Sequence, residues 1–232
     1  MQTEPSADIS ENSKYFIYIA ILFVAVLMIS NTTASKLIEI GPFAVSGAII
    51  IFPISYIFGD ILTEVYGYKA SRKIIWSGFG ALILMSFCYW IIQLLPPASF
   101  WQNQGAYKTI LGAVPRITLG SMIAYFAGEF SNSFVLSKMK VWMNGKYLWM
   151  RTIGSTVVGE GVDSFLVIII AFAGTVPNSA LPQLIISGYL FKVAYEVLAT
   201  PFTYLIVKRL KRAEGIDVYD RGIDYNPFTL KE

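Results

Sequence analysis

Residues Gly154–Gly174 read GSTVVGEGVDSFLVIIIAFAG, a mostly apolar stretch with two acids near its middle, Glu160 and Asp163. A helix needs about 20 such residues to cross a bilayer. Residues three apart share a helix face, so both carboxylates point the same way. A charge at the bilayer centre costs about 2.5–3.5 kcal/mol on insertion scales. We therefore predict a membrane-spanning helix whose acidic face lines a functional site; the alternative is a buried ion pair that only fixes helix packing.

The composition indicates a polytopic membrane protein. The chain has 232 residues, of which 55% are hydrophobic and only 14% charged, whereas soluble proteins carry about 25% charged residues. There is no histidine, and the single cysteine, Cys88, lies in an apolar run. These absences argue against zinc, other metal sites and a disulfide framework, so no cofactor is expected. The net charge of +3 does not suggest nucleic-acid binding, because the basic residues flank apolar spans.

Six apolar stretches have the length of a membrane span, which predicts an all-α fold with six transmembrane helices. They are Tyr15–Ser35, Phe43–Glu64, Ile74–Leu95, Pro115–Leu136, Gly154–Gly174 and Leu184–Val207. We expect a transmembrane domain over residues 15–207, a polar N-terminal tail over 1–14 and a solvated C-terminal tail over 208–232. Lysine and arginine gather in the C-terminal tail and in the second–third and fourth–fifth connections, and Lys14 precedes the first span, while the opposite side has only Lys36 and Lys108. The positive-inside rule therefore places both termini in the cytoplasm.

Eight ionisable residues fall inside these spans, with acids in excess. They are Asp60, Glu64, Arg116, Glu129, Glu160, Asp163, Lys192 and Glu196. Intramembrane ionisable residues mark functional sites by default. The predicted substrate-binding residues are Glu129, Asn132, Glu160, Asp163, Lys192, Glu196, Arg116, Asn31 and Asp60. Two alternatives stay open: Asp60 and Glu64 form a salt-bridged cap near Arg72 and Lys73, and Arg116 anchors the outer rim.

Carboxylates, an amide and a lysine beside aromatic residues suit a flat, nitrogen-rich heterocycle. A carboxylate can accept paired N–H groups from such a ring, and aromatic side chains can stack on its faces. We expect Glu160 or Glu129 to accept these groups and Asp163 or Glu196 to pair with Lys192. Candidate aromatic residues are Trp90, Tyr125 and Tyr195. A cation or an amino-acid-like solute would also fit. A proton taken up by one buried carboxylate is a further hypothesis, prompted by the excess of acids.

Several motifs resemble the queuosine-precursor transporter family, also called vitamin-uptake-type transporters. The most specific is GDILTEVYG at Gly59–Gly67, and the others are NTTASK at Asn31–Lys36, PRITLG at Pro115–Gly120, GEFSN at Gly128–Asn132 and LWMRTIGSTVVGEGVDS at Leu148–Ser164. The resemblance covers nearly the whole chain. It implies a multi-pass importer of the bacterial inner membrane, with a fold akin to the substrate-binding subunits of energy-coupling-factor transporters.

The implied substrates are 7-deazaguanine bases, namely 7-cyano-7-deazaguanine and 7-aminomethyl-7-deazaguanine, which are precursors of a modified tRNA nucleoside. The implied mechanism is secondary transport without an ATPase module. The main rival is a passive binding subunit that needs a separate energising complex. An enzyme is a weaker rival, because no serine or cysteine lies beside an evident base. Besides the lipid bilayer and the base, the sequence indicates no partner, and it leaves open whether a homodimer forms.

Overall fold

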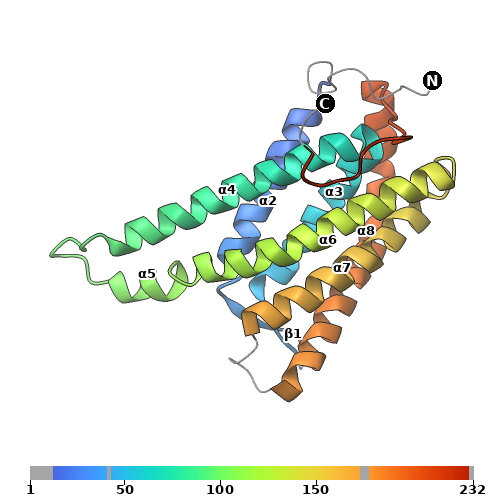
Figure 1. The fold of residues 1–232 in the computed structure, drawn as a ribbon. Coiled ribbons are helices and arrows are strands. Elements are labelled where there is room, and N and C mark those ends of the chain that lie inside the picture. Colours follow the sequence, from blue (N-terminus) through green and yellow to red (C-terminus); the bar gives the residue numbers. More distant parts are fainter. Residues whose placement is uncertain (1–12, 41–42, 173–177, 230–232) are drawn as a thin grey trace.

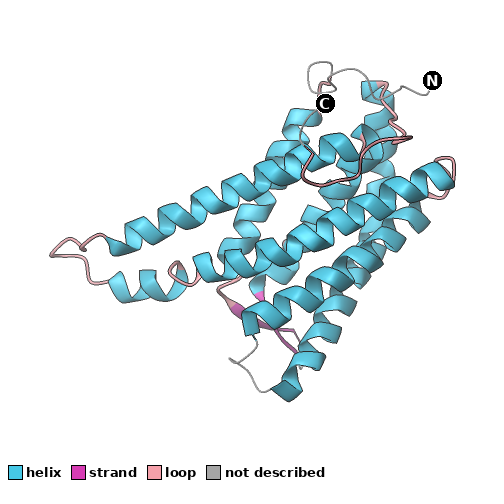
Figure 2. Ribbon diagram, in the orientation of Figure 1, coloured by secondary structure: helices cyan, strands magenta, loops and turns pink. Residues whose placement is uncertain are grey.

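The computed structural model describes residues 13–40, 43–172 and 178–229. Over these ranges the chain is almost entirely helical, apart from one small hairpin (Figure 2). Six segments are long and apolar enough to cross a membrane. The predicted all-α architecture with six spans is therefore confirmed. The last residues of the predicted span Gly154–Gly174 lie outside the described residues.

The elements follow one another as a chain of helices interrupted by the hairpin (Figure 1). They are α2 (Phe16–Thr33), β1 (Leu37–Ile40), β2 (Phe43–Ser46), η1 (Gly47–Ile50), α3 (Phe52–Tyr66), α4 (Tyr68–Leu94), α5 (Gln104–Ile110), α6 (Val114–Trp142), α7 (Leu148–Phe172), η2 (Asn178–Ala180) and α8 (Leu181–Glu214).

The predicted second helix, Phe43–Glu64, is wrong at its start. Residues Phe43–Ser46 form strand β2, which pairs antiparallel with β1 in the register Leu37 to Ser46. A 3₁₀ turn follows, and α3 begins at Phe52 with a proline in its first turn. Proline is favoured there because the first helical N–H groups have no acceptor within the helix. Alternating apolar residues such as Ile38, Ile40 and Val45 fit a strand as well as a helix, so hydropathy alone did not predict the hairpin.

Three helices extend beyond the predicted spans through polar turns. The third span begins at Tyr68, directly after the turn at Gly67, and the fourth reaches Trp142. The last helix continues through Pro201 to Glu214. Their extra turns are polar and lie beyond the apolar cores, so hydropathy alone did not include them. The third–fourth connection, predicted as a loop, contains the short helix α5.

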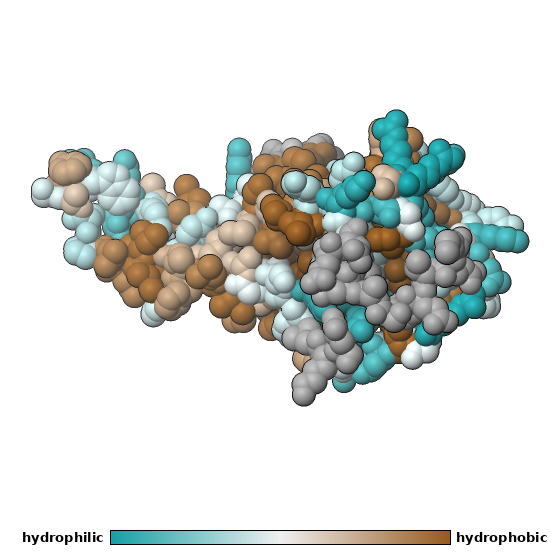
Figure 3. All heavy atoms as spheres, turned by 90° about the horizontal axis from the view of Figure 1, so that it is seen from above, coloured by the Kyte–Doolittle hydropathy of each residue, from teal (hydrophilic) through white to brown (hydrophobic). Residues whose placement is uncertain are grey.

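Helix α3 is the most buried of the six spans, and it contacts α2, α4, α6 and α8. Helices α6, α7 and α8 run side by side, with α7 packed against both of its neighbours (Figure 1). Part of α4 projects beyond the other helices together with α5. Hydrophobic residues predominate along this projection when the molecule is viewed from above (Figure 3). Exposed residues such as Leu84, Phe87 and Trp90 form a surface suited to lipid.

The first and last described helices meet at one end of the bundle. Glu214, at the end of α8, accepts hydrogen bonds from the Ser13 hydroxyl at 2.7 Å and from the backbone N–H groups of Lys14 and Tyr15. An even number of spans returns the chain to its starting side, which agrees with this arrangement. The basic connections around Gly67 and Gly145 lie at the same end, since both contact the C-terminal segment.

The segment after α8 is partly buried against the bundle, whereas the sequence predicted a solvated tail. Val218 and Asp220 are buried, and the Asp220 carboxylate accepts the Tyr68 N–H at 2.9 Å and the Ser137 hydroxyl at 2.6 Å. Gly67, between α3 and α4, has a φ of +86°. A side chain there would also clash, because a Cβ would lie 2.8 Å from both Asp220 and Val218. Glycine at this elbow thus lets the C-terminal segment dock on the bundle.

Candidate functional site

Helices α6 and α7 approach most closely at a pair of glycines. A Cβ on Gly159 would lie 2.8 Å from the Gly128 carbonyl oxygen and 2.7 Å from the Asn132 Cβ. A Cβ on Gly128 would lie 2.8 Å from the Asp163 Cβ and 2.5 Å from the Tyr56 hydroxyl. Small residues at such crossings let helix backbones come close in membranes. The crossing brings the polar side chains of α3, α6 and α7 together.

Asp60 and Asn132 form a buried pair across α3 and α6. The Asn132 amide Nδ2 donates to Asp60 Oδ1 at 2.7 Å, and both residues have no exposed surface. The other acceptor of each side chain, Asp60 Oδ2 and Asn132 Oδ1, has no hydrogen-bond partner among the described residues. Each such acceptor costs about 1–3 kcal/mol when it stays unsatisfied. The pair therefore holds two acceptors that no described residue satisfies.

Lys192 of α8 holds both acids of α7. Its ammonium lies 2.8 Å from the Glu160 carboxylate and 2.5 Å from that of Asp163. The same ammonium lies 4.8 Å from the centre of the Phe52 ring, within the range of a cation–π contact. The expected pairing of Lys192 with Asp163 is confirmed. The alternative prediction of a buried ion pair describes this contact, which ties α7 to α8.

Glu129 and Glu196 are buried carboxylates without a cation in contact among the described residues. Glu129 is fully buried, its Oε1 receives a long hydrogen bond from the Ser133 hydroxyl at 3.4 Å, and the Tyr125 hydroxyl lies beside its carboxylate. A Cβ at Gly59 would clash with its carboxylate, so that glycine makes the room for Glu129. One carboxylate oxygen of Glu129 and one of Glu196 lack a hydrogen-bond partner within the described part of the chain.

Two tyrosines contribute to the same region. Tyr56 and Tyr125 are 1% exposed and pack edge to face, with ring centres 5.6 Å apart. The Tyr56 hydroxyl has no hydrogen-bond partner among the described residues, and the Tyr125 hydroxyl lies beside Ser55 and the Glu129 carboxylate. Tyr125 was predicted to join the site, but Tyr56 was missed. In the sequence Tyr56 is one of several aromatic residues in an apolar run, and only the glycine at position 128 opposite it brings its hydroxyl close to Asp163.

Three candidates lie elsewhere. Asn31 is buried, but its amide oxygen accepts a hydrogen bond from the Ser121 hydroxyl at 2.5 Å and its amide nitrogen donates one to the Leu27 carbonyl. Its side chain therefore links α2 to α6. Arg116 is exposed in the first turn of α6, about 20 Å along the helix from Glu129 at 1.5 Å per residue. Trp90 is 50% exposed on α4. Tyr195 is half-buried on α8, and its role stays a prediction.

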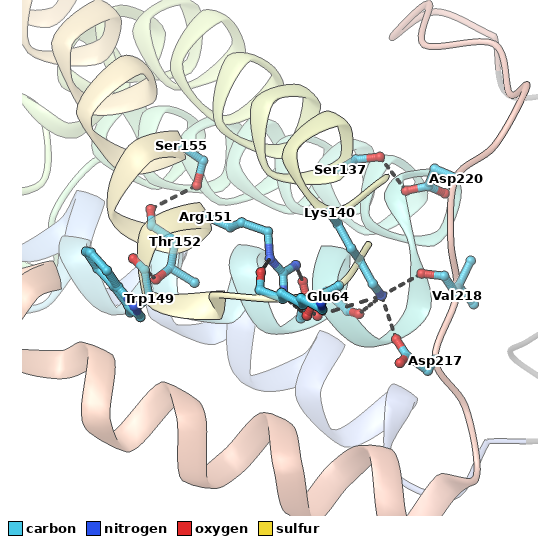
Figure 4. A network of polar contacts seen from close by, with 12 residues as sticks. Glu64, Ser137, Lys140, Trp149, Arg151, Thr152, Ser155, Asp217, Val218 and Asp220 are labelled. Carbon is cyan, nitrogen blue, oxygen red and sulfur yellow. Dashed lines mark hydrogen bonds and ion pairs between the residues drawn. The ribbon is translucent and has the colours of Figure 1, made fainter. Parts of the chain in front are cut away.

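Glu64 forms the predicted salt-bridged cap, but with other cations than Arg72 and Lys73. Figure 4 shows its carboxylate against Arg151, which binds it through both terminal nitrogens. The Lys211 ammonium lies 2.5 Å from the same carboxylate and that of Lys140 3.7 Å away. Arg72 instead donates to backbone carbonyls of the C-terminal segment. The cations that neutralise Glu64 come from three distant helices, so sequence proximity was a poor guide.

Comparison with known proteins places the chain in a family. A family model described as "Putative vitamin uptake transporter" matches residues 46–206, well over half of the chain. The chain belongs to the vitamin uptake transporter family. A relative from Bacillus subtilis (strain 168), named "Probable queuosine precursor transporter", is 33% identical over 156 residues, which cover 67% of this chain and 68% of the relative. No solved structure matches.

Membership in the vitamin uptake transporter family makes this a multi-pass membrane transporter and not an enzyme. The matched range contains the Asp60–Asn132 pair, Glu129, the Lys192 ion cluster and Glu196, while Asn31 lies outside it. The expected likeness to the subunits of energy-coupling-factor transporters stays a prediction.

Proposed function

We propose that this vitamin uptake transporter imports queuosine precursors, the 7-deazaguanine bases, across the bacterial inner membrane. The name of the Bacillus subtilis relative supports the substrate class. The observation that carries the proposal is the pair of free acceptors on Asp60 and Asn132. A guanine-type ring presents two adjacent donors, the ring N–H and the exocyclic amine. Two buried acceptors on hydrogen-bonded neighbours would bind that edge and leave neither donor unpaired.

The surroundings of the pair suit a flat ring. Tyr56, Tyr125 and Phe52 form an edge-to-face cluster beside it, with ring centres 5.5–5.9 Å apart. Such rings give a base a stacking surface worth about 1–3 kcal/mol in other base-binding proteins. The free hydroxyl of Tyr56 can donate to an acceptor on the ring. The site thus combines acceptors for the donor edge with a donor for the opposite edge.

The Lys192 cluster has a different role in this proposal. Because Glu160 and Asp163 are both held by Lys192, the structure favours Asp60 with Asn132, rather than Glu160, as the first contact of the base. The cluster positions α7 against α8 beside the site. Glu196, on the same face of α8 as Lys192, supplies a further free acceptor.

Secondary transport with both termini in the cytoplasm is the form of import that we propose. The rival is a binding subunit that needs an energising complex. Purified protein in proteoliposomes separates the two when uptake of labelled 7-cyano-7-deazaguanine is measured. Saturable uptake, competed by unlabelled 7-aminomethyl-7-deazaguanine but not by adenine, is expected. Tight binding in detergent without any uptake would favour the binding subunit, and neither binding nor uptake would refute the proposed substrate.

A further inference from the structure

Negative charge exceeds positive charge around the proposed site. Among the described residues, five buried acids surround the α3–α6–α7–α8 junction with Lys192 as the cation in contact with them; these are Asp60, Glu129, Glu160, Asp163 and Glu196. Lys192 contacts only the two acids of α7. Burying an ionised carboxylate without a partner is far more costly than burying its neutral form. At least one of the remaining acids is therefore expected to exchange a proton.

Glu129 is the fully buried acid that has neither a cation nor an amide donor against its carboxylate among the described residues. Asp60 has a short hydrogen bond from the Asn132 amide, at 2.7 Å. Glu129 has two neutral hydroxyls beside it, Ser133 at 3.4 Å and Tyr125, no exposed surface, and a second oxygen without a hydrogen-bond partner among the described residues. The backbone of α3 at Gly59 closes over its carboxylate. Neutralisation by a proton would remove the cost of this burial without moving any helix.

Glu129 also lies between the two parts of the site. Acidic groups reach it from every helix that packs there. From α3 it faces Asp60 and the Tyr56 hydroxyl. From α7 it faces Glu160 and Asp163, and on its own helix it lies beside Tyr125 and Ser133. The two charged residues of α8 lie next to these groups: Lys192 contacts Glu160 and Asp163, and Glu196 lies near Asp60. A proton on Glu129 therefore changes the repulsion felt by both Asp60 and the Lys192 cluster.

We propose that Glu129 is the proton-binding residue of a proton-coupled transporter, loading a proton from the outer side and releasing it on the inner side together with the base. The inference rests on the proposed function. The protonated carboxyl lowers the negative charge of the closed, base-bound site, which must cross between its outward- and inward-open states in a water-poor interior. Because release of the proton restores the repulsion, movement of the base follows the proton gradient.

The test uses the full chain in proteoliposomes with labelled 7-cyano-7-deazaguanine, chosen because its nitrile does not titrate between pH 5 and 9. An inward, acid-outside gradient is expected to raise wild-type accumulation at least fivefold, and a protonophore should abolish the increase. Glu129→Gln is expected to accumulate the same amount with and without the gradient. Asp224→Asn, which changes an exposed acid outside the spans in the same way, should behave as wild type.

The outcomes separate the role of Glu129, proton coupling and import itself. A gradient effect in Glu129→Gln equal to that of wild type would overturn the role of Glu129. Wild-type uptake that ignores the gradient would overturn proton coupling but leave the importer intact, whereas no wild-type uptake at all would refute the importer and the coupling together. If Glu129→Gln fails to fold, alkalinisation of the outer medium by wild-type protein on addition of the base is measured instead. We expect this alkalinisation, and its absence would refute the coupling.

Discussion

Asn132 donates its amide to Asp60 at 2.7 Å, and each of these fully buried residues keeps one acceptor that no described residue occupies. Proteins rarely bury such acceptors without a partner. The two residues lie on different helices, α3 and α6, and Gly159 lets α7 pack directly behind Asn132. A ligand bound here would contact both helices at once, which is what a transporter needs in order to couple binding to a change of shape.

The charge of Asp60 should matter for binding more than for folding. We expect Asp60→Asn to weaken binding of 7-cyano-7-deazaguanine at least tenfold, because a hydrogen bond to a charged acceptor is worth about 1.5–3 kcal/mol. The melting temperature should change little, since removing a buried charge offsets the altered hydrogen bond. Calorimetric titration and thermal melting in detergent measure the two effects. Glu214→Gln, at the far end of α8, is the matched control, and equal affinities of both variants would exclude Asp60 from the site.

The glycine crossing of α6 and α7 should be intolerant of a single methyl group. Gly159→Ala places its Cβ 2.8 Å from the Gly128 carbonyl oxygen, and overpacking of this kind costs about 1–3 kcal/mol. Gly161→Ala, half a turn away, meets only Tyr189 at 3.7 Å, an ordinary contact. We expect the first variant to melt at a lower temperature than wild type and the second to melt at the same temperature or higher. Indistinguishable melting curves for the two variants would show that the crossing is looser than described.

The Glu64 cluster should contribute strongly to stability. In Glu64→Gln the buried guanidinium of Arg151 loses its anion, and Lys211 and Lys140 lose a shared partner. Breaking one side of a buried ion pair costs about 3–5 kcal/mol. A large drop in melting temperature is expected, whereas Lys208→Gln, which changes an exposed cation of α8, should have almost no effect. A stable Glu64→Gln protein would mean that the three cations do not depend on this carboxylate.

Docking of the C-terminal segment should weaken in acid. Burial would raise the pKa of Asp217, but the Lys140 ammonium, 2.7 Å away, outweighs this and holds the pKa below its usual value. The stabilisation by Asp217 is therefore complete above its ordinary pKa of about 4 and is lost as the pH falls through the lower, folded-state pKa. Hydrogen exchange at Val218, whose N–H donates to the Val65 carbonyl, should be slow at pH 7 and speed up below about pH 4, relative to the intrinsic rate.

Asp217→Asn isolates this contribution from that of Asp220. Burial raises the pKa of Asp220, so protonation of Asp220 in acid favours the folded state instead of weakening it. The variant should exchange faster than wild type at neutral pH and show less change in acid. The same pH profile in variant and wild type would assign the docking to Asp220 and the backbone contacts alone.

Much of the architecture could be predicted from the sequence because apolar length and charge placement are local signals. The six spans, the inward acids of α7 and the pairing of Lys192 with Asp163 all follow from them. The sequence did not predict the features that depend on how the helices are rotated against one another. Tyr56 and Gly59 enter the site only because α3 turns that face toward α6, and Glu64 finds cations from α6, α7 and α8. The docked C-terminal segment was missed because its alternating charges and aromatic residues resemble a solvated tail.

The most direct test of the account compares two ligands that differ by one donor, 7-deazaguanine and 7-deazahypoxanthine, which lacks the exocyclic amine. Their affinities are measured for wild type and for Asn132→Leu, which keeps the side-chain volume but removes the free acceptor. Wild type should prefer 7-deazaguanine at least tenfold, and the variant should bind the two ligands within about twofold of each other. A preference of the same size in both proteins would show that the Asp60–Asn132 pair does not read the donor edge.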